Sequence, residues 1–192
     1  MARIPENQAV FFELDGVVLD QPRLNGEGAV PWLPHALNSL ARIDPSRFKL
    51  FVATNRTDIG FGQLREREFR KLSEALVREA RAEGIEIAKI YACPYHPKAR
   101  AKYRKESVFR KPSPGMFKMA QQEFDLDLSR CWMIGHTTTD ILAGSRAGVG
   151  TVLVRTGQGG QDGAFQVAPH FIEDDVRGAV SRIGNFEKAQ LV

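Results

Sequence analysis

Short apolar runs alternate with longer amphipathic stretches along the chain. The runs predict strands at Ala9–Leu14, Phe48–Thr54, Ile85–Cys93, Cys131–Gly135 and Thr151–Arg155. Apolar residues at helical spacing predict helices at Pro31–Ile43, Gly62–Glu83, Ser113–Phe124, Thr139–Ala147 and Val176–Ile183. Such alternation is typical of a parallel sheet with right-handed crossovers. We therefore expect an α/β, three-layer Rossmann-like fold with a mainly parallel central sheet and helices on both faces.

The size of the chain limits its organisation. A chain of 192 residues with 43% apolar content suits one compact domain, and we expect a single domain over residues 1–192. The sequence has no apolar run of about 18 residues, and residues 1–7 lack the pattern of a signal peptide, so we expect a cytoplasmic protein without a membrane partner. Two isolated cysteines, Cys93 and Cys131, supply neither a disulfide framework nor a complete thiolate metal site.

Basic residues are moderately in excess, with a formal net charge of +4. Most are interspersed with acids, which is typical of solvated helix faces. The densest block, residues 98–105, falls in a predicted loop, where it could attract an anionic substrate. We do not expect nucleic-acid binding from this pattern, and the sequence leaves a protein partner open.

Polar residues follow the predicted strands at the edge where such folds bind ligands. Residues 11–18 read Phe-Phe-Glu-Leu-Asp-Gly-Val-Val, and residues 50–55 read Leu-Phe-Val-Ala-Thr-Asn. Residues 110–116 read Arg-Lys-Pro-Ser-Pro-Gly-Met, and residues 133–140 read Met-Ile-Gly-His-Thr-Thr-Thr-Asp. A lysine at a helix start opposes the helix dipole, and a bound anion would resolve that conflict.

These four motifs, in this order within about residues 8–157, resemble those of the haloacid dehalogenase-like (HAD) superfamily of phosphohydrolases. The resemblance implies that Asp15 protonates the leaving group and then activates water. It also implies that Thr54 and Asn55 bind the phosphoryl group and that Lys111 neutralises charge. By this resemblance the expected catalytic residues are Glu13, Asp15 and Lys111.

Two positions depart from the superfamily pattern. Glu13 stands where the nucleophilic aspartate is expected, and its extra methylene moves the attacking oxygen by up to about 1.5 Å. A misplacement of about 1 Å can cost on the order of 100-fold in rate. Glu13 could be an unusual nucleophile, a ligand to a cation or only a retained charge.

The second departure is His136, at the position of an acid that holds Mg²⁺ in the superfamily. Mg²⁺ prefers oxygen ligands, whereas imidazole suits Mn²⁺, Zn²⁺ and similar ions better. One expectation is a Mg²⁺ or transition-metal site made by Glu13, Asp15, His136 and Asp140. The other is that a protonated His136 pairs with Glu13, so that the site binds an anion without metal.

Within the superfamily the chain resembles the branch of heptose bisphosphate phosphatases and histidinol phosphatases, through Thr54-Asn55 and residues 93–97 and 110–116. That branch lacks a large cap domain and carries a structural zinc loop. Only Cys93 matches the zinc ligands, because Tyr95, Ser107 and Phe109 occupy the other positions. We expect no structural zinc. Arg110 is expected to contact a second phosphate or a sugar hydroxyl.

Three functional hypotheses follow. The first is a scaffold that binds a small phosphorylated metabolite of the sugar phosphate class, with phosphohydrolase activity lost or much reduced by the changes at positions 13 and 136. The alternative is an active phosphomonoester hydrolase with an unusual metal site. A nucleic-acid-binding or purely structural module is the third.

Overall fold

A computed structural model describes residues 7–189 of the chain. The strands are β1 (Gln8–Phe12), β2 (Phe48–Asn55), β3 (Ile87–Cys93), β4 (Trp132–Gly135), β5 (Gly150–Val154) and β6 (Phe171–Glu173). They form one parallel sheet in the order β3-β2-β1-β4-β5-β6. The expected α/β fold is therefore confirmed. The stretch that lacks a signal-peptide pattern lies, apart from residue 7, outside the described range, as do residues 190–192 of the expected domain.

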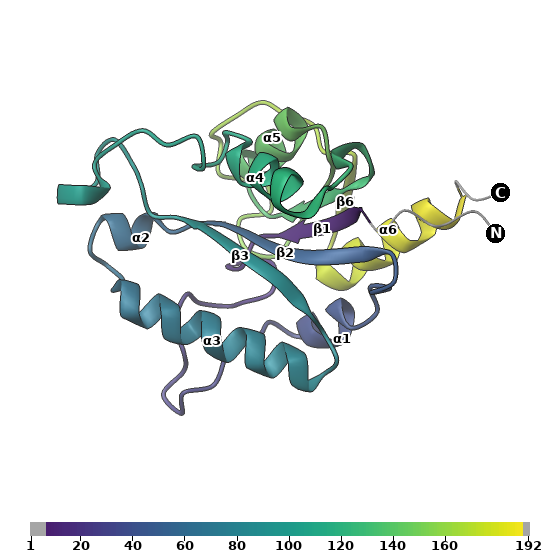
Figure 1. The fold of residues 1–192 in the computed structure, drawn as a ribbon, viewed down its shortest axis with the longest axis horizontal. Helices are drawn as coiled ribbons and strands as arrows, with labels where there is room; N and C mark the ends of the chain where they lie inside the picture. Colours follow the sequence, from purple (N-terminus) through teal and green to yellow (C-terminus); the bar gives the residue numbers. More distant parts are fainter. Residues whose placement is uncertain (1–6, 190–192) are drawn as a thin grey trace.

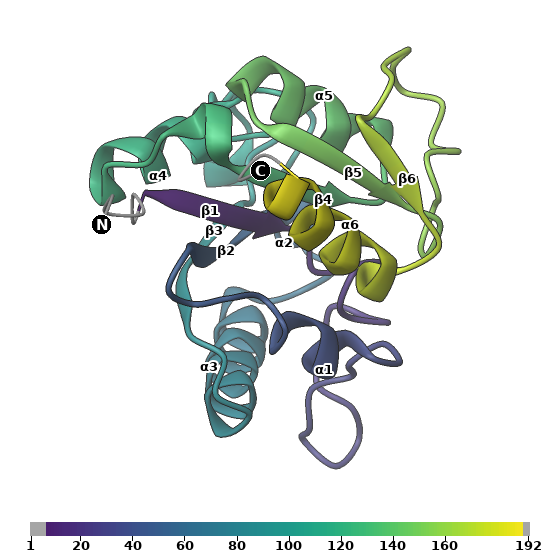
Figure 2. The ribbon, with the colours of Figure 1, turned by 90° about the vertical axis from the view of Figure 1, so that its right-hand side faces the viewer.

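Helices cover both faces of this sheet (Figures 1 and 2). They are α1 (Ala36–Leu40), α2 (Thr57–Gly60), α3 (Glu66–Ala82), α4 (Gly115–Phe124), α5 (Thr138–Ala147) and α6 (Val176–Ala189), with short 3₁₀ turns η1 (Ala101–Tyr103) and η2 (Leu128–Arg130). Figure 1 shows α4 and α5 above the sheet and α1 and α3 below it. The result is a three-layer molecule.

Strand β1 explains why both faces are covered. Its side chains alternate between the two faces of the sheet. Val10 and Phe12 join the core between the sheet and α1, α3 and α6, whereas Ala9 and Phe11 join the core between the sheet and α4 and α5. All five residues of the strand are buried, which is typical of a central parallel strand. The ring of Phe11 packs 4.8 Å from that of Phe117 on α4, measured between ring centroids.

The order of the strands places the ends of β1, β2 and β4 together. Strand β1 pairs with β2 on one side and with β4 on the other, and Phe12 is in register with Val52 and Ile134. The chain builds outward to β3 and then crosses to β4, so the order reverses beside β1. Ligands bind at such a switch point, outside the carboxyl ends of the strands.

Several predicted boundaries were wrong. Helix α1 begins at Ala36 rather than residue 31, because His35 has a left-handed backbone with φ of 66°. Helix α3 begins after Arg65, whose N–H donates to Glu68 Oε2 at 2.8 Å. The short elements β6 and α2 were not predicted, because three or four residues show no measurable period.

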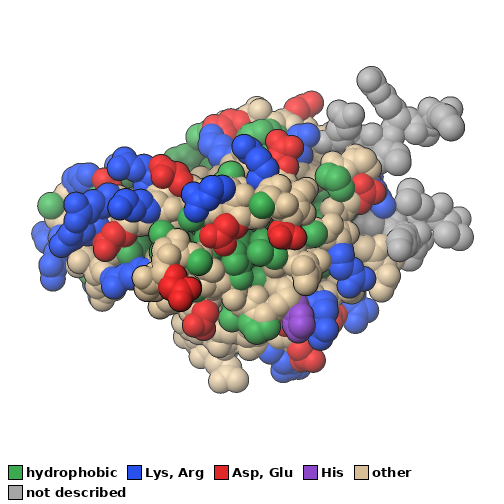
Figure 3. All heavy atoms as spheres, turned by 90° about the horizontal axis from the view of Figure 1, so that it is seen from below, with side chains coloured by type: hydrophobic (Ala, Val, Ile, Leu, Met, Phe, Trp, Pro, Cys, Tyr) green, Lys and Arg blue, Asp and Glu red, His purple; other side chains and the backbone are tan. Residues whose placement is uncertain are grey.

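Basic side chains gather at one end of the molecule, on the left of Figure 3. This end includes the loop after β3, where the exposed basic residues are Lys98, Arg100, Lys102, Arg104 and Lys105. The loop is tied to α3 because Tyr103 and Lys102 both contact Glu66 Oε1, Lys102 at 3.2 Å. Among residues 7–189, no helix has the length and apolar character needed to cross a membrane.

Candidate functional site

The ammonium group of Lys111 is the centre of a buried charged cluster at the carboxyl edge of the sheet. Its Nζ lies 2.5 Å from Glu13 Oε2, directly after β1, and 2.6 Å from Asp140 Oδ1, in the first turn of α5. It also donates to the carbonyl oxygen of Ala53 in β2 at 2.6 Å. Lys111 is 1% exposed. The structure therefore brings together three predicted site residues that are far apart in the sequence.

Mutual attraction keeps Lys111 and Asp140 ionised. Burial by itself lowers the pKa of Lys111, but the charges of Asp140 and Glu13 more than offset it, so this pKa is raised. Burial likewise favours the neutral form of Asp140, yet the charge and hydrogen bond of Lys111 hold the pKa of that carboxyl below its ordinary value. At neutral pH Lys111 is therefore a cation and Asp140 an anion.

Backbone N–H groups fix the two carboxylates. Glu13 Oε1 accepts from the N–H of Leu14 at 2.8 Å. Asp140 Oδ2 accepts from the N–H groups of His136 and Thr137, both at 3.1 Å. All four carboxylate oxygens of Glu13 and Asp140 therefore have a hydrogen-bond donor.

Asp15 has its own cation, Arg56, which the sequence analysis did not identify. Nη2 of Arg56 bonds to Asp15 Oδ2. The guanidinium carbon lies 5.4 Å from the ring centroid of Phe69 on α3, and the backbone N–H donates to the oxygen of Cys93 at 2.8 Å. Burial lowers the pKa of Arg56, but the charge and hydrogen bond of Asp15 and the charges of Glu13 and Asp58 together outweigh this, so the pKa is raised. The only signal in the sequence is the position of Arg56 directly after Thr54-Asn55.

His136 is enclosed by glycines rather than paired with Glu13, so the predicted pairing was wrong. Its Nδ1 accepts from the N–H of Gln158 at 3.0 Å. A Cβ built on Gly16 would lie 2.8 Å from this nitrogen, and one built on Gly157 would lie 2.4 Å from it. The loop that follows β5 therefore packs directly against the ring.

Asn55 positions Lys111 rather than standing free. Its Nδ2 donates to the backbone oxygen of Lys111 at 3.0 Å, and its Oδ1 accepts from the backbone N–H of Lys111 at 3.0 Å. By contrast, the Thr54 hydroxyl and the Nη1 atoms of Arg56 and Arg110 have no hydrogen-bond partner among the described residues. These three groups are buried donors whose hydrogen bonds the described residues leave unmade.

Of the predicted metal ligands, Glu13 and Asp140 meet around Lys111. Asp15 is held by Arg56, and His136 lies against glycines. Among residues 7–189, no group of three or more His, Cys, Asp or Glu side chains is arranged to hold a metal ion. The oxygens of Glu13 and Asp140 are engaged by Lys111 and by backbone N–H groups, and His136 Nδ1 is engaged by Gln158. Of the carboxylate oxygens of Glu13, Asp15 and Asp140, Asp15 Oδ1 alone has no hydrogen-bond partner among the described residues. In this arrangement the donors do not fit Mg²⁺, which takes several oxygen ligands.

The loop over residues 93–109, which the sequence aligns with a zinc loop, contains aromatic rings that pack against other side chains. Lys105 Nζ lies 3.9 Å from the ring centroid of Tyr95, and the rings of Tyr95 and Tyr103 are 6.4 Å apart. Phe109 packs against the core beneath α4 and α5, and Cys93 is buried with a free thiol. Each of these side chains thus has a packing role in the described chain.

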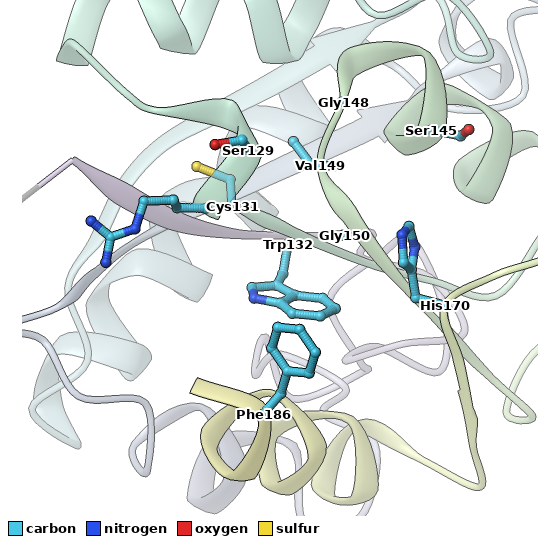
Figure 4. A pocket seen from close by; sticks show the side chains of 10 residues that line it. Ser129, Cys131, Trp132, Ser145, Gly148, Val149, Gly150, His170 and Phe186 are labelled. Atoms are coloured by element: carbon cyan, nitrogen blue, oxygen red, sulfur yellow. The ribbon is translucent and has the colours of Figure 1, made fainter. Parts of the chain in front are cut away.

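A cavity of about 430 Å³ lies away from this cluster, at the amino ends of β4 and β5 (Figure 4). Trp132 and Phe186 face each other within it, with ring centroids 5.1 Å apart. His170 Nδ1 lies 3.0 Å from Thr151 Oγ1. The described residues that line the cavity include no carboxylate, so it lacks the acid–base groups of the Lys111 cluster.

Sequence comparisons show similarity to phosphatases of one kind. The HAD-hydrolase-like family model matches residues 108–179. The D-glycero-alpha-D-manno-heptose-1,7-bisphosphate 7-phosphatase of Burkholderia mallei is 36% identical over 151 residues, which cover 78% of this chain and 80% of that enzyme. The D-glycero-beta-D-manno-heptose-1,7-bisphosphate 7-phosphatase of Vibrio cholerae is 32% identical over 153 residues, covering 78% and 82%.

Solved structures show the same fold. D,D-heptose 1,7-bisphosphate phosphatase from B. bronchiseptica, complexed with magnesium and phosphate, matches with a TM-score of 0.79 at 23% identity and covers 93% of this chain and 99% of its own. A putative HAD-like phosphatase from Mesorhizobium loti matches with a TM-score of 0.76 at 26% identity, covering 96% and 86%.

Proposed function

Since the chain belongs to the HAD-like hydrolase family and has heptose bisphosphate phosphatases among its relatives, we propose that it hydrolyses a phosphate monoester of a small sugar. The observation that carries the proposal is the contact of 2.5 Å between Glu13 Oε2 and Lys111 Nζ at the carboxyl edge of the sheet. A carboxylate and a buried cation are thereby held side by side where the fold binds ligands. The relatives named above support the sugar phosphate class.

Each residue has a defined step in this reaction. The Glu13 carboxylate attacks phosphorus, the bond from phosphorus to the sugar oxygen breaks, and Asp15 gives a proton to that oxygen. Water then attacks phosphorus and gives a proton to Asp15, and the bond from phosphorus to the Glu13 oxygen breaks, so that phosphate leaves and the Glu13 carboxylate is restored. Lys111 offsets the negative charge of Glu13 and of the phosphoryl group, while Thr54 and Arg110 donate to phosphoryl oxygens.

A second function, binding of the phosphorylated sugar without turnover, is favoured by a specific observation. Both oxygens of Glu13 are held, one by Lys111 and one by the N–H of Leu14. Asp15 is held in turn by Arg56. A nucleophile and an acid that keep these partners would bind a substrate but react slowly with it.

Phosphate release separates the two functions. The wild-type chain and Asp15→Asn are assayed with sugar monophosphates, sugar bisphosphates and an aryl phosphate, with Mg²⁺, with Mn²⁺ and with a chelator. Turnover above that of Asp15→Asn supports the phosphatase. Equal rates, together with calorimetric binding of the sugar phosphate, support a protein that binds without turnover. The absence of both turnover and binding would contradict both functions.

A further inference from the structure

The three carboxylates of the site are held by two buried side-chain cations, Lys111 and Arg56. We propose that this protein binds its phosphorylated ligand without a divalent cation at this place. The identity of the ligand rests on the proposed function, whereas the absence of a metal rests on the geometry of the site alone.

Lys111 occupies the position between Glu13 and Asp140. An ammonium group has three N–H donors, and three oxygens surround this one: Glu13 Oε2 at 2.5 Å, Asp140 Oδ1 at 2.6 Å and the Ala53 oxygen at 2.6 Å. A divalent ion placed between the same two carboxylates would lie within a few ångströms of a buried positive charge. Repulsion at that distance is weakly screened in a buried site.

The outer oxygens of the two carboxylates face backbone N–H groups. Leu14 N–H holds Glu13 Oε1, and the N–H groups of His136 and Thr137 hold Asp140 Oδ2. A cation at these oxygens would have to share them with N–H donors, which draw electron density from the oxygens and weaken their attraction for Mg²⁺. Retaining the hydrogen bonds therefore works against a metal.

His136 does not replace a missing oxygen ligand. Its Nδ1 is already an acceptor for Gln158, and glycines at positions 16 and 157 leave the ring little space to turn. Imidazole is also a poor ligand for a hard cation such as Mg²⁺.

Arg56 holds one oxygen of the third carboxylate, while Asp15 Oδ1 has no hydrogen-bond partner among the described residues. One free oxygen falls short of the several oxygen ligands that Mg²⁺ takes. Arg56 is 5% exposed and bonds to Asp15 through Nη2, and its Nε lies 3.4 Å from Asp58 Oδ1. Its Nη1 has no partner among the described residues, and neither has the hydroxyl of Thr54. A phosphoryl group at this edge would therefore find fixed donors from β2 and the residue after it, in place of a metal ion.

Direct metal binding tests the proposal without requiring turnover. Mn²⁺ alone is titrated into the full chain and followed by electron paramagnetic resonance. The wild type is expected to bind no Mn²⁺ at this site, so its signal for bound Mn²⁺ should equal that of Asp140→Asn. Lys111→Met should gain bound Mn²⁺, because two buried carboxylates lose their cation. The matched control is Lys89→Met, which removes a surface lysine that contacts Glu123 at 2.6 Å and should leave Mn²⁺ binding unchanged.

Ligand affinity gives a second readout. Calorimetry with inorganic phosphate should give the same affinity for the wild type in a chelator and in Mg²⁺. Binding of Mn²⁺ to the wild type that is lost in Asp140→Asn would overturn the proposal. An increase in the affinity for phosphate of about 5- to 150-fold on adding Mg²⁺, the usual size of coupling between two ligands, would also overturn it.

The two readouts separate this proposal from the proposed function. If Lys111→Met does not fold, the wild-type measurements still decide. If no phosphate or sugar phosphate binds in any condition, the proposed function fails, while the Mn²⁺ titration still decides whether the site takes a metal.

Discussion

Lys111 Nζ lies 2.6 Å from Asp140 Oδ1, and both side chains are almost completely buried. The pair joins the segment before α4 to the first turn of α5, and the same ammonium group reaches Glu13 at the end of β1. One side chain therefore ties together three separate parts of the carboxyl edge. The cluster is expected to contribute to stability as well as to binding, which gives the first prediction.

Lys111→Met should reduce the free energy of unfolding by about 3–5 kcal/mol, because the change leaves two buried carboxylates without their cation. Urea unfolding followed by circular dichroism measures this. The control, Lys89→Met, removes an ion pair in which the lysine side chain is about two-fifths exposed. The free energy of unfolding is therefore expected to fall by only about 0–1 kcal/mol. Equal losses in the two variants would show that the buried cluster has no special role.

The stability of the protein should depend on Asp140 in acid. Lys111 holds the pKa of this carboxyl below its ordinary value of 3.8 in the folded chain. The ionised form therefore stabilises the fold above that value, and the contribution is lost as the pH falls towards the lowered pKa. Asp140→Asn should remove this acid-dependent part of the unfolding free energy. If the free energies of unfolding of the wild type and the variant changed in parallel with pH, the prediction would be contradicted.

Gly157→Ala should disturb the site through His136. The new Cβ would lie 2.4 Å from His136 Nδ1, and the backbone φ of Gly157 is +62°. Gly163 has the same φ but no atom within 4 Å of a built Cβ, so Gly163→Ala is a matched control for backbone strain. Strain alone costs about 1–3 kcal/mol in either variant. Thermal unfolding should show a larger loss for Gly157→Ala, and equal losses would mean that the contact with His136 is unimportant.

Restoring aspartate at positions 13 and 136 should raise phosphatase activity. A nucleophile that is misplaced by about 1 Å loses on the order of 100-fold, so the double variant Glu13→Asp/His136→Asp is expected to gain up to that factor with Mg²⁺ present. Initial rates with a sugar phosphate measure the gain. Each single variant serves as a control, and no gain in the double variant would show that these two positions do not limit the rate.

The fold could be predicted from the sequence because its signals are local. Central strands such as β1 and β2 are unbroken apolar runs, and the helices between them have a clear apolar stripe. The short strand β6 could not be predicted, since its burial depends on pairing with β5. The start of α1 depends on the left-handed backbone of His35, which no periodicity indicates.

The site was predictable only as far as its motifs extend. Glu13, Lys111 and Asp140 were expected to meet, and they do so at the carboxyl edge of the sheet. Arg56 was missed because its partnership with Asp15 arises from two different strand ends, not from a spacing in the chain. Sequence reasoning likewise could not place His136 against Gly16 and Gly157, which approach it from separate loops.

The most direct test of the account compares phosphate release by the wild type and by Glu13→Gln. The variant keeps the size of the side chain but removes the carboxylate that contacts Lys111. We expect measurable release of phosphate from a small sugar phosphate by the wild type, and a loss of that activity in Glu13→Gln. Equal rates for the two proteins would show that Glu13 does not carry out the reaction.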